Sequence, residues 1–391
     1  MKKDVATSLP QLVTLSRLLA QARLREPRLV DRLKTLVEIE SPSGDKRAVD
    51  RVVTAFAKWA RQAGGRILRH RNRQYGDSLE VRFGEPQPTE RPILLLGHLD
   101  TVWKRGTLAQ MPWRVTLKRI SGPGVLDMKA GVLMALTAVE VAQDLELLKW
   151  PVTLLIHGDE EIGSPASRRL TESVAKRCRV VYVTEPAQGE IGAYKTARKA
   201  VGKYRLAVTG LAAHSGVDFE RGHSAIIELA RQIETIRTFT DLRRGITVNP
   251  GVIGGGTQCN VVAAEAWVEI DVRLGYANDI SRVDRAFRAL TPHDKFCKLE
   301  LTGGVSRPPM ERTTSTVTLF RRAQSLGARM GVHLEEAATG GASDGNLTAA
   351  LGVPTLDGMG GVGSGAHAMD EHLLRKHLAP RTALIAAMLI S

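Results

Sequence analysis

The sequence predicts an α/β protein in which a second, smaller domain is inserted into the first. In the first half, short continuous apolar runs alternate with helical segments, which is typical of parallel strands buried on both faces. Between about residues 200 and 309 the expected order becomes βαββαβ, the split arrangement of a ferredoxin-like sandwich. The predicted fold class is therefore an α/β sheet domain with an inserted βαββαβ domain.

Three apolar runs define the sheet of the first domain. Strands are expected at Ile93–Leu96, Val152–Ile156 and Val180–Val183, each bounded by turn or polar residues. A helix is expected at Gly131–Gln143, between the first two strands.

The N-terminal segment is predicted to be helical over residues 10–64. One helix should begin near Lys46, with Ser43 as its N-cap, and Gly64 and Gly65 should end it. Its apolar residues repeat at helical spacing, at Val49, Val52, Val53, Phe56 and Trp59.

The inserted domain is predicted from six elements. The expected strands are Tyr204–Val208, Thr247–Ile253, Ala266–Val272 and Lys298–Leu301, and the expected helices are Ser224–Ile236 and Val283–Leu290. The first domain should resume with the helix Thr316–Ala328 and the strand Leu334–Ala338. We therefore expect residues 1–199 and 310–391 to form one domain, and residues 200–309 the other.

The composition is that of an ordinary soluble protein, with 43% hydrophobic and 25% charged residues in a chain of 391. No apolar run approaches the roughly 20 residues that span a bilayer. Asp4 and Arg17 interrupt the N-terminal segment, so it lacks the apolar stretch of about 7–15 residues that a secretory signal needs. We expect a cytoplasmic protein with no membrane partner.

The chain is basic, since 55 lysines and arginines minus 41 acids leave a net charge of +14. The basic residues are spread along the chain rather than gathered in blocks, and aromatic residues make up 4%. We therefore rank three explanations of the positive charge: a solvated basic surface first, attraction of acidic substrates second, and nucleic-acid binding third. We expect no nucleic-acid partner.

Polar side chains cluster where the predicted strands of the first domain end. His98 and Asp100 follow the first strand, Glu160 and Glu161 follow the second, and Glu185 follows the third. Ligands bind at the carboxyl ends of the strands in an open α/β sheet. We therefore expect these side chains to meet at one edge of the sheet.

Two further candidates lie in glycine-rich loops, Asp127 after residues 122–124 and His367 after residues 363–366. Acids gathered in one place raise one another's pKa values unless cations neutralise them. A two-metal site needs a bridging carboxylate with ligands on either side, and nitrogen and oxygen ligands suit zinc, cobalt or manganese. A cysteine zinc site or a disulfide framework is not expected. The three cysteines lie far apart without a CxxC pair, at Cys178, Cys259 and Cys297.

Five ordered motifs make the sequence resemble a known family. They are Gly97–Val102, Gly124–Gly131, Asp159–Ser164, Thr184–Pro186 and Gly365–His367. Together they resemble the dinuclear zinc metallopeptidase family of glutamate carboxypeptidase, acetylornithine deacetylase, succinyl-diaminopimelate desuccinylase and aminoacylase. The similarity covers nearly the whole chain. The Glu-Pro form of the fourth motif and the run over residues 340–346 are most similar to the glutamate carboxypeptidase branch.

The resemblance implies a role for each candidate. It assigns the metal ligands as Asp127 bridging two ions, His98 and Glu185 on one ion, and Glu161 and His367 on the other. Zinc is the implied metal, with cobalt or manganese as alternatives. Glu160 is the implied general base, and Asp100 is expected to hydrogen-bond His98, because residues i and i+2 of an extended segment face the same side. A cis peptide bond is also implied after Asp127.

The implied reaction is hydrolysis of an amide bond next to a free carboxylate, as in a carboxypeptidase or dipeptidase acting on a small peptide, with C-terminal glutamate as one candidate. Two cations would lower the pKa of a bridging water, Glu160 would take its proton, and the resulting hydroxide would attack the carbonyl. Glu160 would then pass the proton to the leaving amine. The alternative substrate is an N-acyl amino acid, as in acetylornithine deacetylase or aminoacylase.

The inserted domain, by the same resemblance, serves as a lid and dimerisation domain. Residues 210–216 resemble the family segment whose histidine, here His214, enters the partner's active site as an oxyanion donor. Asn260, Arg273 and, as a weaker match, Arg307 correspond to positions that grip the substrate carboxylate. A plain strand-face charge is the alternative for Arg273. We expect a homodimer, since helices cover one face of such a domain and its sheet edge is free to pair with a copy.

Competing interpretations rest on other motifs. Residues 341–345 fit the G-x-S-x-G elbow, and Asp357 and His367 follow Ser343 in hydrolase order, so a serine hydrolase is an alternative that leaves the acids unexplained. Residues 358–363 fit G-x-G-x-x-G, but no clear helix opens there and little chain remains for a dinucleotide unit. A non-catalytic peptide-binding homologue is disfavoured because Glu160 and all five candidate ligands are present.

Overall fold

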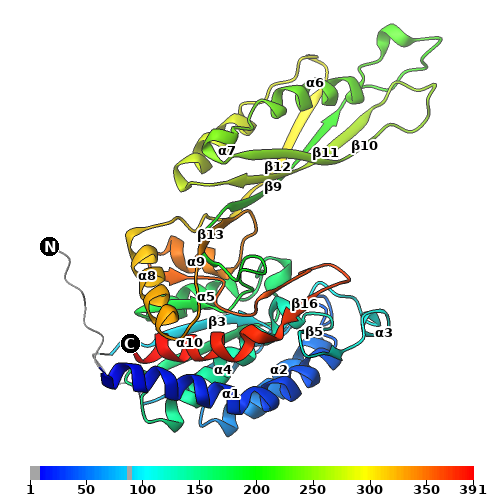
Figure 1. The fold of residues 1–391 in the computed structure, drawn as a ribbon. Helices are drawn as coiled ribbons and strands as arrows, with labels where there is room; N and C mark the ends of the chain where they lie inside the picture. The colour runs from blue at the N-terminus through cyan, green and yellow to red at the C-terminus, as the bar shows by residue number, and fades with distance from the viewer. Residues whose placement is uncertain (1–8, 86–89) are drawn as a thin grey trace, which may run out of the picture. The chain divides into compact units, whose positions relative to one another are not determined.

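The computed structural model describes residues 9–85 and 90–391, which divide into two compact units (Figure 1). The larger unit contains the described residues up to Ala197, together with Arg312–Thr339 and Ser343–Ser391. The inserted unit contains Arg198–Glu311 and Gly340–Ala342. Within the described ranges, no helix combines the length and the apolar character needed to cross a bilayer.

A six-stranded sheet forms the centre of the larger unit. Its strands lie in the order β1 (Arg66–His70), β2 (Ser78–Phe83), β6 (Val152–His157), β3 (Ile93–His98), β7 (Val180–Val183) and β14 (Thr355–Leu356). Strands β6, β3, β7 and β14 are parallel to one another, β2 pairs antiparallel with β6, and β1 pairs antiparallel with β2. The three predicted strands are present, and β3 and β6 continue to His98 and His157.

Helices bury both faces of this sheet. Residues Ile93 and Leu95 of β3 join a core with α1 (Leu9–Glu38), α2 (Lys46–Gln62), α4 (Ala130–Asp144), α8 (Thr314–Arg329) and α10 (Leu378–Ile390). The alternate residues Leu94 and Leu96 face a second core beside α5 (Arg168–Ala175) and α9 (Asp344–Ala350). Because successive strand residues point to opposite faces, an unbroken apolar run satisfies both layers.

Helix α2 corrects one detail of the sequence prediction. Its N-cap is Asp45, whose side chain accepts a hydrogen bond of 3.0 Å from the backbone N–H of Ala48. The predicted cap, Ser43, instead lies two residues before it and donates its hydroxyl proton to the Asp100 carboxylate at 2.6 Å. The helix begins at Lys46, as predicted. The partner of Ser43 comes from a distant part of the chain, so capping preference alone selected the wrong cap residue.

Two small sheets complete the larger unit. One pairs β8 (Tyr194–Arg198) with β13 (Glu336–Thr339). The other has the order β15 (Gly363–Ser364), β16 (His372–Leu374), β5 (Arg119–Ser121) and β4 (Arg114–Val115). This second sheet joins the segment before Asp127 to the hairpin that carries His367, although the two are far apart in sequence.

The inserted unit is a four-stranded antiparallel sheet with two helices on one face (Figure 1). Its strand order is β10 (Thr247–Gly255), β11 (Glu265–Leu274), β9 (Ala200–Thr209) and β12 (Lys298–Arg307), and its helices are α6 (Ala225–Arg237) and α7 (Ile280–Arg288). Tyr204 and Phe287 stack at 4.2 Å between ring centroids in its core. The predicted βαββαβ order is present.

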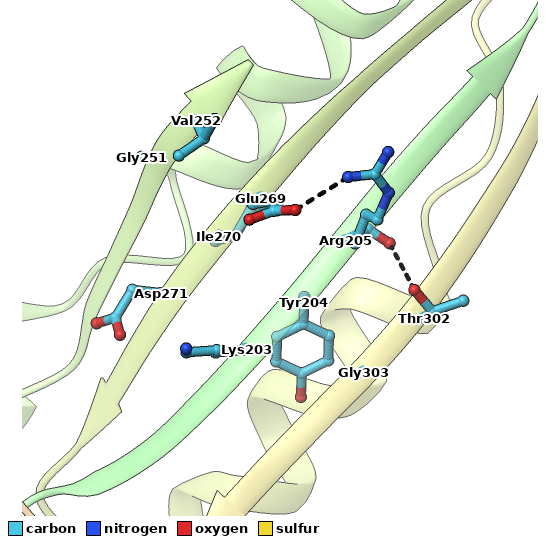
Figure 2. A pocket seen from close by; sticks show the side chains of 10 residues that line it. All are labelled: Lys203, Tyr204, Arg205, Gly251, Val252, Glu269, Ile270, Asp271, Thr302 and Gly303. Atoms are coloured by element: carbon cyan, nitrogen blue, oxygen red, sulfur yellow. Dashed lines mark hydrogen bonds and ion pairs between the residues drawn. The ribbon is translucent and has the colours of Figure 1, made fainter. Parts of the chain in front are cut away.

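The opposite face of this sheet carries polar side chains. Arg205 on β9 pairs with Glu269 on β11 at 3.0 Å (Figure 2). Its guanidinium carbon also lies 4.1 Å from the centroid of the Trp267 ring. A shallow cavity of about 400 Å³ opens there, lined also by Lys203 and Asp271 (Figure 2). None of the residues predicted for the metal site lines this cavity.

Candidate metal centre

The carboxyl ends of three neighbouring strands bring the predicted side chains together. Strand β3 pairs in parallel with β6 on one side and β7 on the other. His98 is the last residue of β3, Glu160 and Glu161 lie on a short 3-10 turn after β6, and Glu185 follows β7. Parallel strands end at the same edge of a sheet, so the sequence positions become neighbours in space.

Asp127 lies on an irregular turn, Val125–Lys129, whose position Glu371 fixes. The Asp127–Met128 peptide bond is cis, as the family resemblance implied. Glu371 is fully buried, and its carboxylate accepts hydrogen bonds from the backbone N–H groups of Asp127 at 3.0 Å and Leu126 at 2.8 Å. It also accepts from the N–H of Gly124 at 2.9 Å and from the Trp103 indole at 2.8 Å.

His367 reaches the same place from the loop between β15 and β16. Its backbone has a positive φ of 63°, and its side chain is half exposed. The preceding Gly365 also has a positive φ, of 81°, and a Cβ there would lie 2.8 Å from the backbone N of Glu371. A residue with a side chain would thus disturb the turn that presents His367.

The two oxygens of Asp127 face two different histidines. His98 Nε2 lies 3.4 Å from Asp127 Oδ1 and 3.4 Å from Glu185 Oε1. His367 Nε2 lies 3.4 Å from Asp127 Oδ2 and 3.2 Å from Glu161 Oε2. The five side chains therefore form two groups that share Asp127.

These distances and the unpaired atoms fit metal ligands better than hydrogen bonds. Protein N–H···O bonds cluster near 2.9–3.0 Å, whereas two ligands on a tetrahedral zinc ion with bonds of about 2.0–2.1 Å lie about 3.3–3.4 Å apart. Within the described residues, Asp127 Oδ1 and Glu161 Oε1 are buried without a hydrogen-bond partner. The donor set of two imidazoles and three carboxylates is suited to zinc, cobalt or manganese.

The charges of this cluster are strongly coupled. Burial lowers the pKa of His98, but the Asp100, Asp127 and Glu185 carboxylates outweigh it and bring the pKa well above its usual value. The Asp127 and Glu161 carboxylates raise the pKa of His367 to about 10. Burial also raises the pKa of Glu161 to about 7. The carboxylates of this cluster therefore strongly favour a bound positive charge, either protons or cations.

Asp100 differs in its contacts from the prediction. His98 Nδ1 lies 2.9 Å from the backbone carbonyl of Asp100, whereas the nearest carboxylate oxygen is 3.4 Å away. The Asp100 carboxylate instead accepts hydrogen bonds of 3.1 Å from the backbone N–H groups of both Glu160 and Glu161. Asp100 thus orients the turn that carries the two glutamates, while its main chain orients the histidine.

Glu160 lies beside the cluster on the side of His98. One of its carboxylate oxygens, one from Glu185 and a ring nitrogen of His98 all lie within 4.8 Å of one another. Glu161, the next residue, points to His367 instead. The two adjacent glutamates therefore serve different sides of the site.

The model of the family described as "Peptidase family M20/M25/M40" matches residues 94–391. The chain belongs to this family. The predicted family, the α/β fold and the assignment as a hydrolase of peptide bonds are confirmed, and the family is metal-dependent.

Individual relatives agree with this assignment to the M20 family. Carboxypeptidase G2 of Pseudomonas sp. (strain RS-16) is 25% identical over 374 residues, which cover 93% of this chain and 89% of that protein. The crystal structure of aminopeptidase PepT from Bacillus cereus superposes with a TM-score of 0.74 at 21% identity, covering 93% and 98% of the two chains. An M20 family metallo-carboxypeptidase from Sulfolobus solfataricus has a TM-score of 0.74 at 15% identity, with the same coverage. These structures support the fold.

Ser343 has a structural role in the M20 chain. It is fully buried and caps α9, accepting a hydrogen bond of 3.0 Å from the N–H of Gly345. Its hydroxyl donates to Asp357 at 2.6 Å, whereas His367 faces Asp127 and Glu161. His367, the histidine that a serine triad would require, is therefore turned away from Ser343. The serine hydrolase interpretation is wrong.

The glycine-rich run over residues 358–363 supports the metal cluster instead of a nucleotide. The N–H of Gly360 donates to the Glu185 carbonyl at 2.9 Å, and the N–H of Ala187 donates to the Gly361 carbonyl at 2.8 Å. The run therefore lies directly along the segment that carries Glu185. Side-chain-free residues allow this close approach of two backbones.

The other predicted residues belong to the inserted unit. His214 and Asn260 lie on adjacent exposed loops, where the N–H of Ser215 donates to the Asn260 carbonyl at 3.0 Å. Arg273 makes a bidentate pair with Asp271 at 2.8 and 2.9 Å, two residues earlier on the same strand face. Arg307 ends β12 and is buried.

Glu371 is the main site residue that sequence reasoning missed. It follows His367 by four residues, and nothing in its immediate sequence indicates that it accepts hydrogen bonds from a turn some 245 residues earlier. Lys129 was also missed: it is buried, and its ammonium group donates to the Leu36 and Ile39 carbonyls at 2.9 and 3.2 Å. A charged residue inside an otherwise apolar motif is the signal that points to such a structural role.

Proposed function

We propose that this chain is a two-metal peptidase that cleaves the peptide bond next to a free carboxylate, as a carboxypeptidase or dipeptidase does. The observation that carries the proposal is the Asp127 carboxylate, whose two oxygens lie 3.4 Å from the Nε2 atoms of His98 and His367. A carboxylate shared between two ligand groups is what a bridged pair of divalent ions requires. Zinc fits the distances, and cobalt and manganese accept the same ligands.

The proposed metal ligands divide into two sets around the bridge. His98 and Glu185 would hold one ion, and His367 and Glu161 the other, in line with the pairs of contacts at 3.2–3.4 Å. When bound, the two ions would polarise the scissile carbonyl and lower the pKa of the attacking water. Glu371 and Asp100 hold the backbone of the ligand-bearing turns, which keeps the ligands in place before the metal binds.

Glu160 is the proposed general base and acid. Its carboxylate lies beside the His98 and Glu185 side of the cluster, and Asp100 fixes its backbone N–H at 3.1 Å. From there it would accept a proton from the attacking water and donate it to the nitrogen of the leaving amine. The neighbouring Glu161 is directed at His367 and is not free for this work.

The inserted unit is proposed to recognise the substrate carboxylate. An arginine fork matches a carboxylate in a bidentate geometry, and Asp271 orients the Arg273 guanidinium group through its Nε and Nη2 atoms. Asn260 and Arg307 are proposed to assist, and His214 to donate a hydrogen bond to the oxyanion. We further propose that the unit forms a homodimer through β10, an edge strand with the exposed residues Val252 and Ile253.

A substrate screen tests the proposed function. Dipeptides that end in glutamate, aspartate or a neutral residue are compared with their C-terminal carboxamides and with N-acyl amino acids, each with zinc, cobalt or manganese. We expect cleavage of the free acids and a fall in kcat/KM of about 10²-fold for the carboxamides, because charge-assisted hydrogen bonds are lost. Equal cleavage of acids and carboxamides would refute carboxylate recognition, and a clear preference for N-acyl amino acids would favour a deacylase.

A further inference from the structure

Helix α10 buries an arginine among apolar residues. Arg381 lies one turn into α10, is 1% exposed, and is followed by Thr382–Leu389, all of which are buried. Burying an unpaired cation costs several kcal/mol in real proteins. An arginine cannot escape this cost by losing its proton, because its intrinsic pKa exceeds 12.

The guanidinium group has no carboxylate partner in the part of the chain that the structure describes. Its Nε and Nη2 atoms are buried without a hydrogen-bond partner. Its one charge-related contact is the ring of Tyr194, whose centroid lies 4.3 Å from the guanidinium carbon. Burial lowers the pKa of Arg381, and the Tyr194 phenol opposes this effect only in part. A cation–π contact is weaker than the cost of burying an unpaired cation, so it does not offset the burial.

Two other polar groups beside Arg381 are also unsatisfied. The hydroxyl of Tyr194 is buried without a partner, and so is Nε2 of His377, one helical turn before Arg381. The positive charge of Arg381 contributes to lowering the pKa of His377, after burial and Lys376, so the two groups are electrostatically close. All three groups can donate a hydrogen bond, which is the chemistry of an anion site.

A glycine loop packs closely against the guanidinium. Gly192 has a positive φ of 73°, and a Cβ on it would lie 3.6 Å from Arg381 Nη1 and 2.9 Å from the Val362 side chain. The absence of a side chain therefore lets this loop pack against the arginine, where a Cβ would clash with Val362. Because Arg381 and Tyr194 are almost completely buried, a peptide or a nucleotide would not fit.

We propose that Arg381, together with Tyr194 and His377, binds a small monovalent inorganic anion such as chloride inside the larger unit. The anion would neutralise the guanidinium and accept hydrogen bonds from the unpaired Nε–H, Nη2–H and hydroxyl groups. Gly192 packs against the arginine and Val362 packs against Gly192. The two residues belong to the segments around Glu185 and Gly360, which are hydrogen-bonded to each other. The anion is therefore a structural ligand that holds these segments together rather than a participant in the reaction.

Diffraction from crystals of the metal-loaded full chain grown with bromide in place of chloride tests the site directly. We expect an anomalous peak next to Arg381 Nε and Nη2 and the Tyr194 hydroxyl. Ordered water or empty density at that place, with bromide bound elsewhere, would overturn the proposal. This measurement needs no variant, so it stays decisive if substitutions at residue 381 prevent folding.

Thermal unfolding provides the second test, at fixed metal loading and with gluconate keeping the ionic strength constant. The midpoint should rise by about 2 °C for each tenfold increase in chloride above the dissociation constant, because a ligand bound by the native state stabilises it by mass action. Arg381→Met should abolish this dependence. The control Arg375→Met removes a partly exposed arginine that pairs with Glu26 at 2.8 Å, and it should leave the dependence unchanged. A chloride response equal in wild type and Arg381→Met would overturn the proposal.

Discussion

Two adjacent glutamates illustrate how single residues acquire different roles. Glu160 and Glu161 are neighbours in sequence, and Asp100 binds the backbone N–H of each at 3.1 Å. Their side chains nevertheless diverge, Glu160 towards His98 and Glu161 towards His367. The backbone of one short turn sets the different directions of the two side chains. Substitution of each glutamate should therefore have a different effect.

Replacing each glutamate by glutamine should separate base from ligand. Glu160→Gln should keep the proposed two ions per chain and lose about 10²–10⁴-fold in kcat, the usual contribution of a general base. Glu161→Gln should bind less metal, because an amide is a weaker ligand than a carboxylate. Elemental analysis and steady-state kinetics measure both effects. A fully active Glu160→Gln enzyme, or wild-type activity with no more than one ion per chain, would contradict the assignment.

Glu371 should matter as a positioning residue. In Glu371→Gln, an NH₂ group replaces one of the two oxygens that accept N–H donors, so a buried donor loses its partner at a cost of about 1–3 kcal/mol. The variant should also bind metal about 10–100-fold more weakly, as is usual when a group that supports the ligands is removed. Metal titration and thermal unfolding check this.

Glu190→Gln is the control for this substitution. It changes an acid that is 53% exposed and lies 3.6 Å from His372. It should leave metal affinity unchanged. Equal metal affinity in Glu371→Gln and the wild type would show that the Asp127 turn holds its shape without this carboxylate.

Among the helices and strands, those set by local sequence pattern could be predicted, whereas those set by long-range packing could not. The apolar runs of β3, β6 and β7 were predictable, because a strand buried on both faces needs an unbroken apolar sequence. The placement of Asp127 and His367 was suggested by motif resemblance, not by local pattern, since β5 and β16 meet through pairing across some 250 residues. Asp45 replaced Ser43 as the α2 cap for the same reason: the partner of Ser43 lies on a distant loop.

Gly360 offers a test at this level. A Cβ at this position would lie 2.1 Å from the Thr184 carbonyl oxygen, so Gly360→Ala must push apart the two segments that hold Glu185. We expect destabilisation of about 1–3 kcal/mol and weaker metal binding, measured by thermal unfolding and metal titration. Gly341→Ala is the control, since no atom lies within 4 Å of its added carbon. Matching stabilities of the two variants would argue against this close packing.

For the whole molecule, the proposed homodimer leads to a complementation experiment. Glu160→Gln chains and His214→Ala chains should each be nearly inactive, because an oxyanion donor contributes about 10²–10³-fold. If His214 serves the partner's active site, mixed dimers contain one site with both residues intact. Co-expressed chains with different affinity tags should therefore recover activity well above either parent. Purified mixed dimers without recovery would show that His214 does not act across the interface.

The points where the chain enters and leaves the inserted unit lie side by side. The N–H of Arg198 donates to the Met310 carbonyl at 2.9 Å, and the N–H of Met310 donates to the Arg198 carbonyl at 3.0 Å. The segment of 111 residues between them therefore starts and ends at neighbouring positions in the structure. An inserted domain of this kind, here called a cassette, can be gained, exchanged or deleted as a whole. A short linker could then join the two flanking parts of the chain. The hydrolytic centre, whose proposed ligands all lie outside the cassette, could therefore keep its chemistry while evolution changes the module that chooses its substrates.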